Sequence, residues 1–296
     1  MSIPFAAPAR SPASRGILLM LLAILLFTSM DAAAKGLMAT YPAPQVVWAR
    51  FAGQLLIVVL LLNRRTGPVL RTRFPRLHLI RSAFQFGASV FFFASLAHIG
   101  LAEATALTDI SPVMITLGAA VFLGEKLGPR RIAGVLAAMI GALIVIRPGA
   151  GVFTPAALLP IASAVCYTGN VLITRYIGPQ ETAWTSMLYA ALFGTLFSAC
   201  LLPWFWAPIA AADLPRFALL GVLGTAAQVC IIRSFTLTEA AVVAPFSYAG
   251  IVVATFWGIV LYGEYPDRWT VVGALVIVSA GLYVWHRETL AARNAA

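Results

Sequence analysis

The sequence predicts an all-α membrane protein with ten transmembrane helices, arranged as two inverted five-helix repeats. The 296 residues are 61% hydrophobic and 10% charged, with a mean hydropathy of +0.93. Soluble domains are instead about 45–50% apolar and 25% charged. The apolar segments are roughly 19–25 residues long and carry helical spacing, which suits the ~30 Å hydrocarbon core of a bilayer. Barrel strands would alternate polar and apolar residues instead.

The repeat is visible in two stretches, residues 101–149 and 237–286. Each reads as an apolar helix, a tight Gly-Glu turn and a second apolar helix. Gly124-Glu125 and Gly263-Glu264 are separated by 263 − 124 = 139 positions. The chain therefore looks like one unit written twice.

The first repeat is expected at residues 16–149, after a loose N-terminal tail at 1–15 that is rich in Pro, Ala and Ser. The first helix could instead be a signal peptide, because Ala32, Ala33 and Ala34 resemble a cleavage site. A matching helix at 155–177 argues that it is retained. The expected helices of this repeat are 16–38, 44–63, 77–99, 103–123 and 128–147.

The second repeat is expected at residues 150–286, followed by a short C-terminal tail at 287–296. If both termini are cytoplasmic, the inner segments hold thirteen Lys and Arg residues and the outer segments hold four, as the positive-inside rule requires. We therefore expect a multi-pass membrane protein with both termini in the cytoplasm. Five is an odd number, so the second repeat must enter the membrane from the opposite side. The expected helices are 155–177, 181–203, 214–235, 239–262 and 268–286.

Inverted repeats are typical of transporters, because two oppositely oriented halves can exchange conformations. The sequence shows no Gly-rich phosphate loop, no nucleophile elbow and no metal-ligand spacing, so we expect no enzyme activity, no cofactor and no metal site. Cys166, Cys200 and Cys230 lie within apolar segments and read as buried hydrophobes. The net charge of +10 is assigned to the inner loops, and a nucleic-acid partner is not expected.

The signature around each Gly-Glu turn resembles the EamA-type branch of the drug/metabolite transporter superfamily, in particular its exporters of amino acids and metabolites. The resemblance implies that the protein lies in the bacterial inner membrane. The resemblance implies a central cavity walled by the first four helices of each repeat, with the fifth helix of each repeat peripheral. The second copy departs from the first, since Tyr265-Pro266 follows its Gly-Glu. The resembling residues are Pro112, Leu123-Gly-Glu-Lys126, Gly134 and Gly141, and in the second copy Leu261-Tyr-Gly-Glu264, Gly273 and Gly281.

Two prolines are expected to break helices inside the membrane. Pro112 follows Thr108 and Asp109, and Pro245 lies in the matching helix. A proline cannot donate its backbone hydrogen bond and so frees a carbonyl of the preceding turn. Such carbonyls could bind an ammonium group in a substrate cavity. The alternative is a kink satisfied by the hydroxyl of Thr108.

Charged residues within the spans are candidates for function. Asp31 lies well inside the first helix, where a charge costs ~2.5–3.5 kcal/mol on insertion scales, and is a candidate proton carrier. The alternative is an ion pair with Lys35, one helical turn away. Arg50, near the expected outer mouth, is a candidate partner for a substrate carboxylate. Arg81 and Arg233 are expected to snorkel to the membrane surface.

Uncharged polar residues complete the candidate cavity. Such side chains face a bundle interior rather than lipid, although they can serve only as contacts between helices. The carboxylates of Glu125 and Glu264 are expected to cap the helices that follow them. Besides Thr108 and Asp109, the cavity candidates are Gln85, Ser89, Tyr167, Asn170, Gln228, Ser247 and Tyr248.

These observations predict a secondary transporter that exports amino acids or related metabolites by alternating access. Its partners are then a small-molecule substrate and the lipid bilayer, and the protein acts as a monomer or a weak homodimer. Two alternatives stay open. One is a membrane scaffold that transports nothing, and the other is a carrier of the same fold for a drug, nucleoside or sugar derivative.

Overall fold

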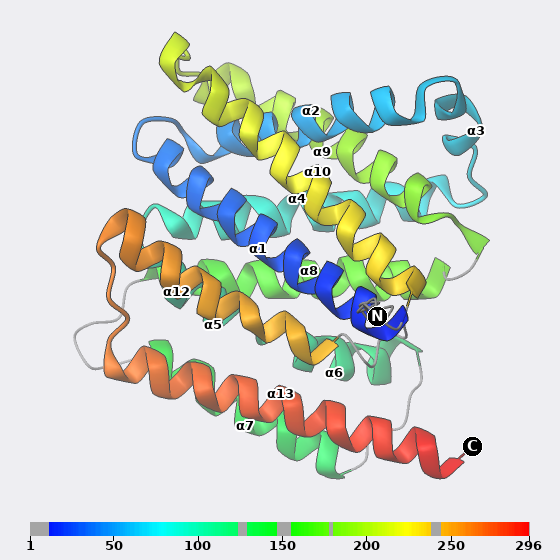
Figure 1. Cartoon of the computed structure of the whole chain (residues 1–296), viewed down its shortest axis with the longest axis vertical. Coiled ribbons are helices and arrows are strands. Elements are labelled where there is room, and N and C mark those ends of the chain that lie inside the picture. The colour runs from blue at the N-terminus through cyan, green and yellow to red at the C-terminus, as the bar shows by residue number, and fades with distance from the viewer. Residues whose placement is uncertain (1–11, 124–128, 147–154, 178–179, 238–243, 296) are drawn as a thin grey trace, which may run out of the picture.

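The computed structural model describes residues 12–123, 129–146, 155–177, 180–237 and 244–295. In these ranges the chain forms helices joined by turns and loops (Figure 1). No strand occurs within these ranges. The first part of the chain forms α1 (Pro12–Met38), α2 (Ala43–Leu62), η1 (Asn63–Arg65), α3 (Thr66–Val69), α4 (Pro75–Leu96), α5 (Leu101–Thr108), α6 (Ser111–Leu123) and α7 (Pro129–Ile146). The rest forms η2 (Pro155–Ala157), α8 (Leu158–Ile177), α9 (Ala183–Phe205), η4 (Ala211–Asp213), α10 (Leu214–Leu237), η5 (Ala244–Tyr248), α12 (Ala249–Tyr262) and α13 (Arg268–Ala295).

Most helix positions agree with the sequence to within a few residues, but several differ. The segment expected at 103–123 begins at Leu101 and, as expected from Pro112, is broken: a turn at Asp109 and Ile110 divides it into α5 and α6. α1 begins at Pro12, inside the expected tail, and α13 continues to Ala295, beyond the expected end at His286. The loop between α2 and α4 contains the short helices η1 and α3, which the sequence did not predict.

The exterior of the bundle is apolar, as a lipid-facing surface must be. Large hydrophobic side chains such as Leu60 (67% exposed) and Phe122 (77% exposed) lie on it. Helices α1, α2, α4, α8, α9 and α10 are long and apolar enough to cross a membrane, while the apolar stretches 132–146, 246–262 and 268–283 are shorter. The chain is therefore a multi-pass membrane protein.

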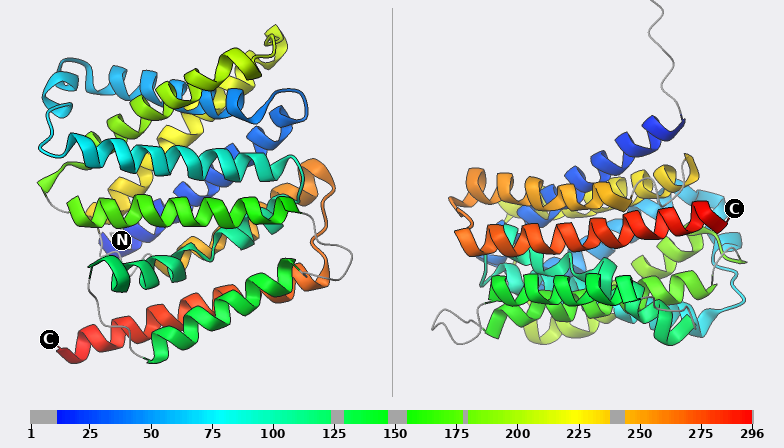
Figure 2. Two further views of the ribbon diagram at one scale, coloured as in Figure 1. Left: turned by 180° about the vertical axis from the view of Figure 1, so that it is seen from behind. Right: turned by 90° about the horizontal axis from the view of Figure 1, so that it is seen from below.

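Helices from the two parts of the chain pack against each other in reciprocal pairs. α1 packs on α10 and α4 packs on α8, so the first and third long helices of one part meet the third and first of the other. α2 packs on α9, α5 on α12, and α7 on α13. Figures 1 and 2 show α7 and α13 side by side at one end of the bundle. The main core lies around α1, α2 and α4 and includes Phe51, Phe93 and Leu101.

Candidate functional site

The polar centre of the bundle is built around Arg50 of α2. Its guanidinium donates a 3.0 Å hydrogen bond to Ser89 Oγ of α4 and lies 5.4 and 5.5 Å from the rings of Phe51 and Phe93. Arg50 Nε is buried without a hydrogen-bond partner in the described part of the chain. The guanidinium is thus held by a neutral hydroxyl and two aromatic faces, and part of its hydrogen-bonding capacity is left for another group.

Asp31 of α1 is the carboxylate that acts on Arg50. The two groups interact electrostatically within the protein, but no ion pair within 4.0 Å joins them. Asp31 also does not pair with Lys35, which was the alternative considered from the sequence, because Lys35 Nζ binds Glu264 at 2.8 Å. That alternative is wrong, since the Lys35 side chain extends away from Asp31 toward the α12–α13 turn.

A chain of hydrogen bonds continues from Ser89 across α4 to α8. Ser89 Oγ donates to the carbonyl of Gln85 at 3.1 Å, and Asn170 Nδ2 donates to Gln85 Oε1 at 2.8 Å. Asn170 Oδ1 is buried without a partner among the described residues. A buried amide oxygen without a hydrogen bond is costly, so this atom is a further place where a bound group could donate.

The turn between α5 and α6 carries a second buried carboxyl, that of Asp109. Its backbone N–H bonds to Thr105 O at 2.9 Å, while its Oδ2 is buried with no partner in the ranges that the structure describes. The Thr108 hydroxyl donates to Ala104 O at 2.9 Å, so it satisfies a carbonyl one turn earlier. Pro112 lies in the first turn of α6, where a missing N–H costs nothing.

Tyr167 and Tyr248 lie within electrostatic reach of Asp109. The Tyr248 hydroxyl lies where a side chain on Gly281 of α13 would have to fit, and it has no hydrogen-bond partner within the described ranges. Tyr248 is thus turned toward α13. Pro245 and Ser247 belong to the 3₁₀ segment η5, and Gln228 lies half-buried on α10. Most candidates therefore fall into two groups. Asp31, Gln85, Ser89 and Asn170 lie around Arg50, and Tyr167 and Tyr248 lie around Asp109. No hydrogen bond among the described residues joins Gln228 to either group.

Glu264 has a different role from the one expected. It does not cap α13, where Asp267 Oδ1 accepts from Thr270 N at 2.7 Å. Its carboxylate instead accepts from Leu101 N at 3.0 Å, at the start of α5. Gly263, with a φ of 64°, ends α12 in the left-handed conformation that favours glycine and turns Glu264 back toward α5. Glu125 lies outside the described residues.

Arg81 also differs from expectation. It does not snorkel, because it is only 6% exposed and donates to the carbonyl of Ser186 and to Thr174 Oγ1 at 3.4 Å. Arg233 is exposed, in agreement with the expectation. Sequence reasoning missed the pairing of Lys35 with Glu264. The available signals in the sequence were the isolated position of Lys35 at a helix end and the repeated Gly-Glu turn.

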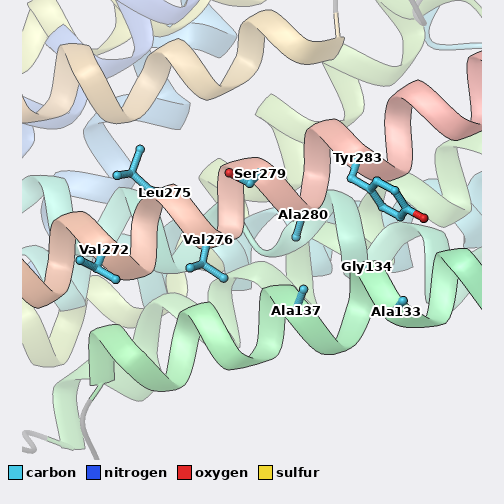
Figure 3. Close-up of a pocket in the computed structure, with 9 residues that line it drawn as sticks. All are labelled: Ala133, Gly134, Ala137, Val272, Leu275, Val276, Ser279, Ala280 and Tyr283. Carbon is cyan, nitrogen blue, oxygen red and sulfur yellow. The ribbon is translucent and has the colours of Figure 1, made fainter.

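Two hollows lie away from the Arg50 group. One of about 720 Å³ adjoins the Lys35–Glu264 pair and is lined by the ends of α1, α4 and α12. The other, of about 550 Å³, is a groove between α7 and α13 (Figure 3). Ser279 and Tyr283 carry its polar side chains, and the rest of its lining is apolar. This groove faces outward and has the character of a lipid contact rather than of a polar site.

The whole chain is similar to known transporters. Residues 14–147 and 154–285 each match the EamA-like transporter family. The chain is 32% identical over 271 residues to the pseudopaline exporter CntI of Pseudomonas aeruginosa, covering 90% of this chain and 94% of that protein. It is 30% identical over 280 residues to the riboflavin transporter of Rhizobium johnstonii, covering 92% and 91%.

More distantly similar proteins include an uptake transporter and a protein of known structure. The S-adenosylmethionine uptake transporter of Rickettsia bellii is 22% identical over 275 residues, with 93% of this chain and 94% of that protein covered. A solved crystal structure covers 95% of this chain and 99% of its own, with a TM-score of 0.64 and 21% identity, which supports the fold. The matched family and these relatives are transporters, not enzymes. Since both segments match it, the chain belongs to the EamA-like transporter family of the drug/metabolite transporter superfamily.

Proposed function

We propose that this protein is a secondary transporter of the bacterial inner membrane that exports small organic solutes, first of all amino acids or related metabolites. The observation that carries this proposal is the group around Arg50. Its members come from α1, α2, α4 and α8, and two of their buried polar atoms, Arg50 Nε and Asn170 Oδ1, have no partner in the described part of the chain. A bound solute would supply those partners.

The chemistry of the two groups suits a zwitterion. The Arg50 guanidinium can bind a carboxylate in a bidentate manner, and the Ser89 hydroxyl keeps the guanidinium in position. The unpartnered oxygens of Asn170 and Asp109 are acceptors, which suits an ammonium group. Among relatives, the names report export of pseudopaline and transport of riboflavin and S-adenosylmethionine, so substrates vary within the family.

The mechanism in this proposal is alternating access between two inverted repeats, at 16–149 and 150–286, each of five spans. The reciprocal packing supports it, since exchanging the two parts of the chain maps the α1–α10 contact onto the α8–α4 contact. The double match to one family supports it as well. Both termini are then cytoplasmic. Single cysteines at Thr66 and Ala212 should react with an impermeant reagent from opposite sides, and reaction from the same side would contradict this topology.

The function is tested by solute flux in proteoliposomes. The panel should contain amino acids, nucleosides, drugs, riboflavin and S-adenosylmethionine, with and without a pH gradient. We expect flux of at least one amino-carboxylate solute, a loss of about tenfold or more in Arg50→Met, and no loss in Arg216→Gln, whose side chain is 69% exposed. A tenfold loss corresponds to about 1.4 kcal/mol, which is close to the contribution of one hydrogen bond to a charged group.

Two results would contradict the proposal. Protein that moves no solute in the panel would favour a scaffold. Flux confined to solutes without a carboxylate, and unchanged in Arg50→Met, would favour a carrier of a different substrate class.

A further inference from the structure

One ion pair ties three helix ends together at the edge of the bundle where α1, α4 and α12 end. Lys35 Nζ lies 2.8 Å from Glu264 Oε1 and also donates to Leu96 O at 2.9 Å and Ile99 O at 2.7 Å. Glu264 Oε2 accepts from Leu101 N at 3.0 Å. The pair therefore joins the end of α1, the α4–α5 turn and the α12–α13 turn, and it links the two parts of the chain.

Tyr262 of α12 makes further contacts beside the Lys35–Glu264 pair. The hydroxyl of Tyr262 donates to Ala32 O of α1, and its ring lies 5.7 Å from Lys35 Nζ. The hydroxyl also lies against Gly36, where an added Cβ would be 3.0 Å away. In Figure 1 the ends of α1 and α12 lie at one edge of the bundle. The ends of α1, α4 and α12 are thus held together by direct contacts.

The Lys35–Glu264 pair is only partly buried, so the two charges can be separated. The Lys35 side chain is 11% exposed and the Glu264 side chain 30%, and the hollow of about 720 Å³ adjoins both. A deeply buried pair is very costly to separate because neither charge can be hydrated. Here the hollow allows water to reach each charge, so the pair can open at a moderate cost.

A second carboxylate is available to Lys35 on its own helix. Asp31 precedes Lys35 by four residues, and residues at this spacing lie on the same helix face, within reach of each other. Asp31 currently interacts with Arg50 without a direct ion pair. Among the described residues no ion pair within 4.0 Å involves Asp31, so it can accept Lys35 once Glu264 moves away.

We propose that Lys35 and Glu264 form the gate at the outer end of the transport path, and that Lys35 exchanges Glu264 for Asp31 when the gate opens. This inference rests on the proposed function, since a gate requires a path. It adds the residues that close the path and links the gate to the group around Arg50, because Asp31 belongs to both.

The gate is tested by chemical accessibility, which needs no substrate. In a background with Cys166, Cys200 and Cys230 replaced by serine, Ser89→Cys is the reporter, and intact cells are treated with a membrane-impermeant maleimide. Ser89 is 3% exposed and lies on α4, two helical turns before Leu96, whose carbonyl accepts from Lys35 Nζ. We expect labelling roughly five- to tenfold faster in Glu264→Gln, because the closed state loses an ion pair. Lys35→Met removes the Lys35 pair from both the closed and the open state and should label more slowly than Glu264→Gln.

Matched variants separate the gate from a general loss of structure. Lys35→Arg keeps the charge and the donors for Leu96 and Ile99 and should label at the parental rate. Arg216→Gln removes an exposed pair with Asp213 near the α1–α2 loop and should also label at the parental rate. Each variant is first checked by size-exclusion chromatography, and Glu264→Asp replaces any variant that aggregates, with intermediate labelling expected.

The exchange of partners is tested by a double variant. Glu264→Gln combined with Asp31→Asn should label at least about threefold more slowly than Glu264→Gln alone, because the open state loses its ion pair. Equal labelling of these two would overturn the exchange, and parental labelling of Glu264→Gln would overturn the gate. If labelling changes as expected while no solute moves, the proposed function fails and the gate stands. If solutes move while labelling stays unchanged, the gate alone fails.

Discussion

Gly53 of α2 and Gly221 of α10 bring their backbones into direct contact. A Cβ added to Gly221 would lie 2.7 Å from Gly53 Cα, and one added to Gly53 would lie 2.9 Å from Gly221 Cα. Small residues at helix crossings allow such close approach in membranes, where packing rather than the hydrophobic effect drives association. Because α2 and α10 belong to different parts of the chain, this crossing fixes how the two parts fit.

We therefore expect Gly221→Val to destabilise the protein by about 1–3 kcal/mol through overpacking, or roughly 3–9 °C in Tm. Thermal unfolding in detergent, followed by size-exclusion chromatography, measures the change. Gly67→Ala is the matched control, because nothing lies within 4 Å of a Cβ at that position. An unchanged Tm in Gly221→Val would show that the α2–α10 crossing tolerates a wider separation.

The hydrogen bond between Gln85 and Asn170 predicts a measurable coupling across the α4–α8 contact. A double-mutant cycle of Gln85→Ala and Asn170→Ala should give a coupling energy of about 0.6 kcal/mol, and at most about 1.7. Ser163→Ala removes another contact of the same helix pair, the 2.8 Å bond to Ala88 O, and should be additive with Gln85→Ala. Coupling of the Ser163 variant as strong as that of Asn170 would contradict a direct bond.

Glu181 predicts the protease sensitivity of the basic loop between α2 and α4. Its carboxylate accepts from Thr72 Oγ1 at 2.5 Å and from Arg73 N at 3.1 Å. Glu181→Ala should speed tryptic cleavage after Arg71 and Arg73 by roughly fivefold, which corresponds to a loss of ~1 kcal/mol. Thr66→Ala removes only a bond within the loop, to Asn63 O, and should cleave as the parent does.

If Asp31 carries a proton, solute flux should respond to a pH gradient in the parent and lose that response in Asp31→Asn, because an amide cannot ionise. The measurement is flux of one solute with and without the gradient at equal substrate concentration. Flux in Asp31→Asn that still follows the gradient would remove Asp31 from this role. A parent indifferent to pH would argue for facilitated diffusion.

The sequence predicted the helices well because bilayer thickness and apolar periodicity set their length. The division of one span at Asp109 followed from Pro112, since proline acts on its own turn. The partners of Lys35, Glu264 and Arg81 did not follow. Local spacing favoured Asp31 for Lys35 and the next helix for Glu264, but tertiary packing brought α12 against α5 and presented stronger partners. Spacing along one helix cannot report such contacts between helices.

Gly263 and Glu264 have separate roles in the α12–α13 turn: the first sets the direction of the chain, and the second makes the contacts. The glycine reverses the chain with its left-handed backbone, and the carboxylate then reaches Lys35 and Leu101 N. Inserting a single residue between the two would rotate the carboxylate away from both partners while leaving α12 intact. The register of this dipeptide, together with its composition, therefore determines whether the ends of α1, α4 and α12 can be held together.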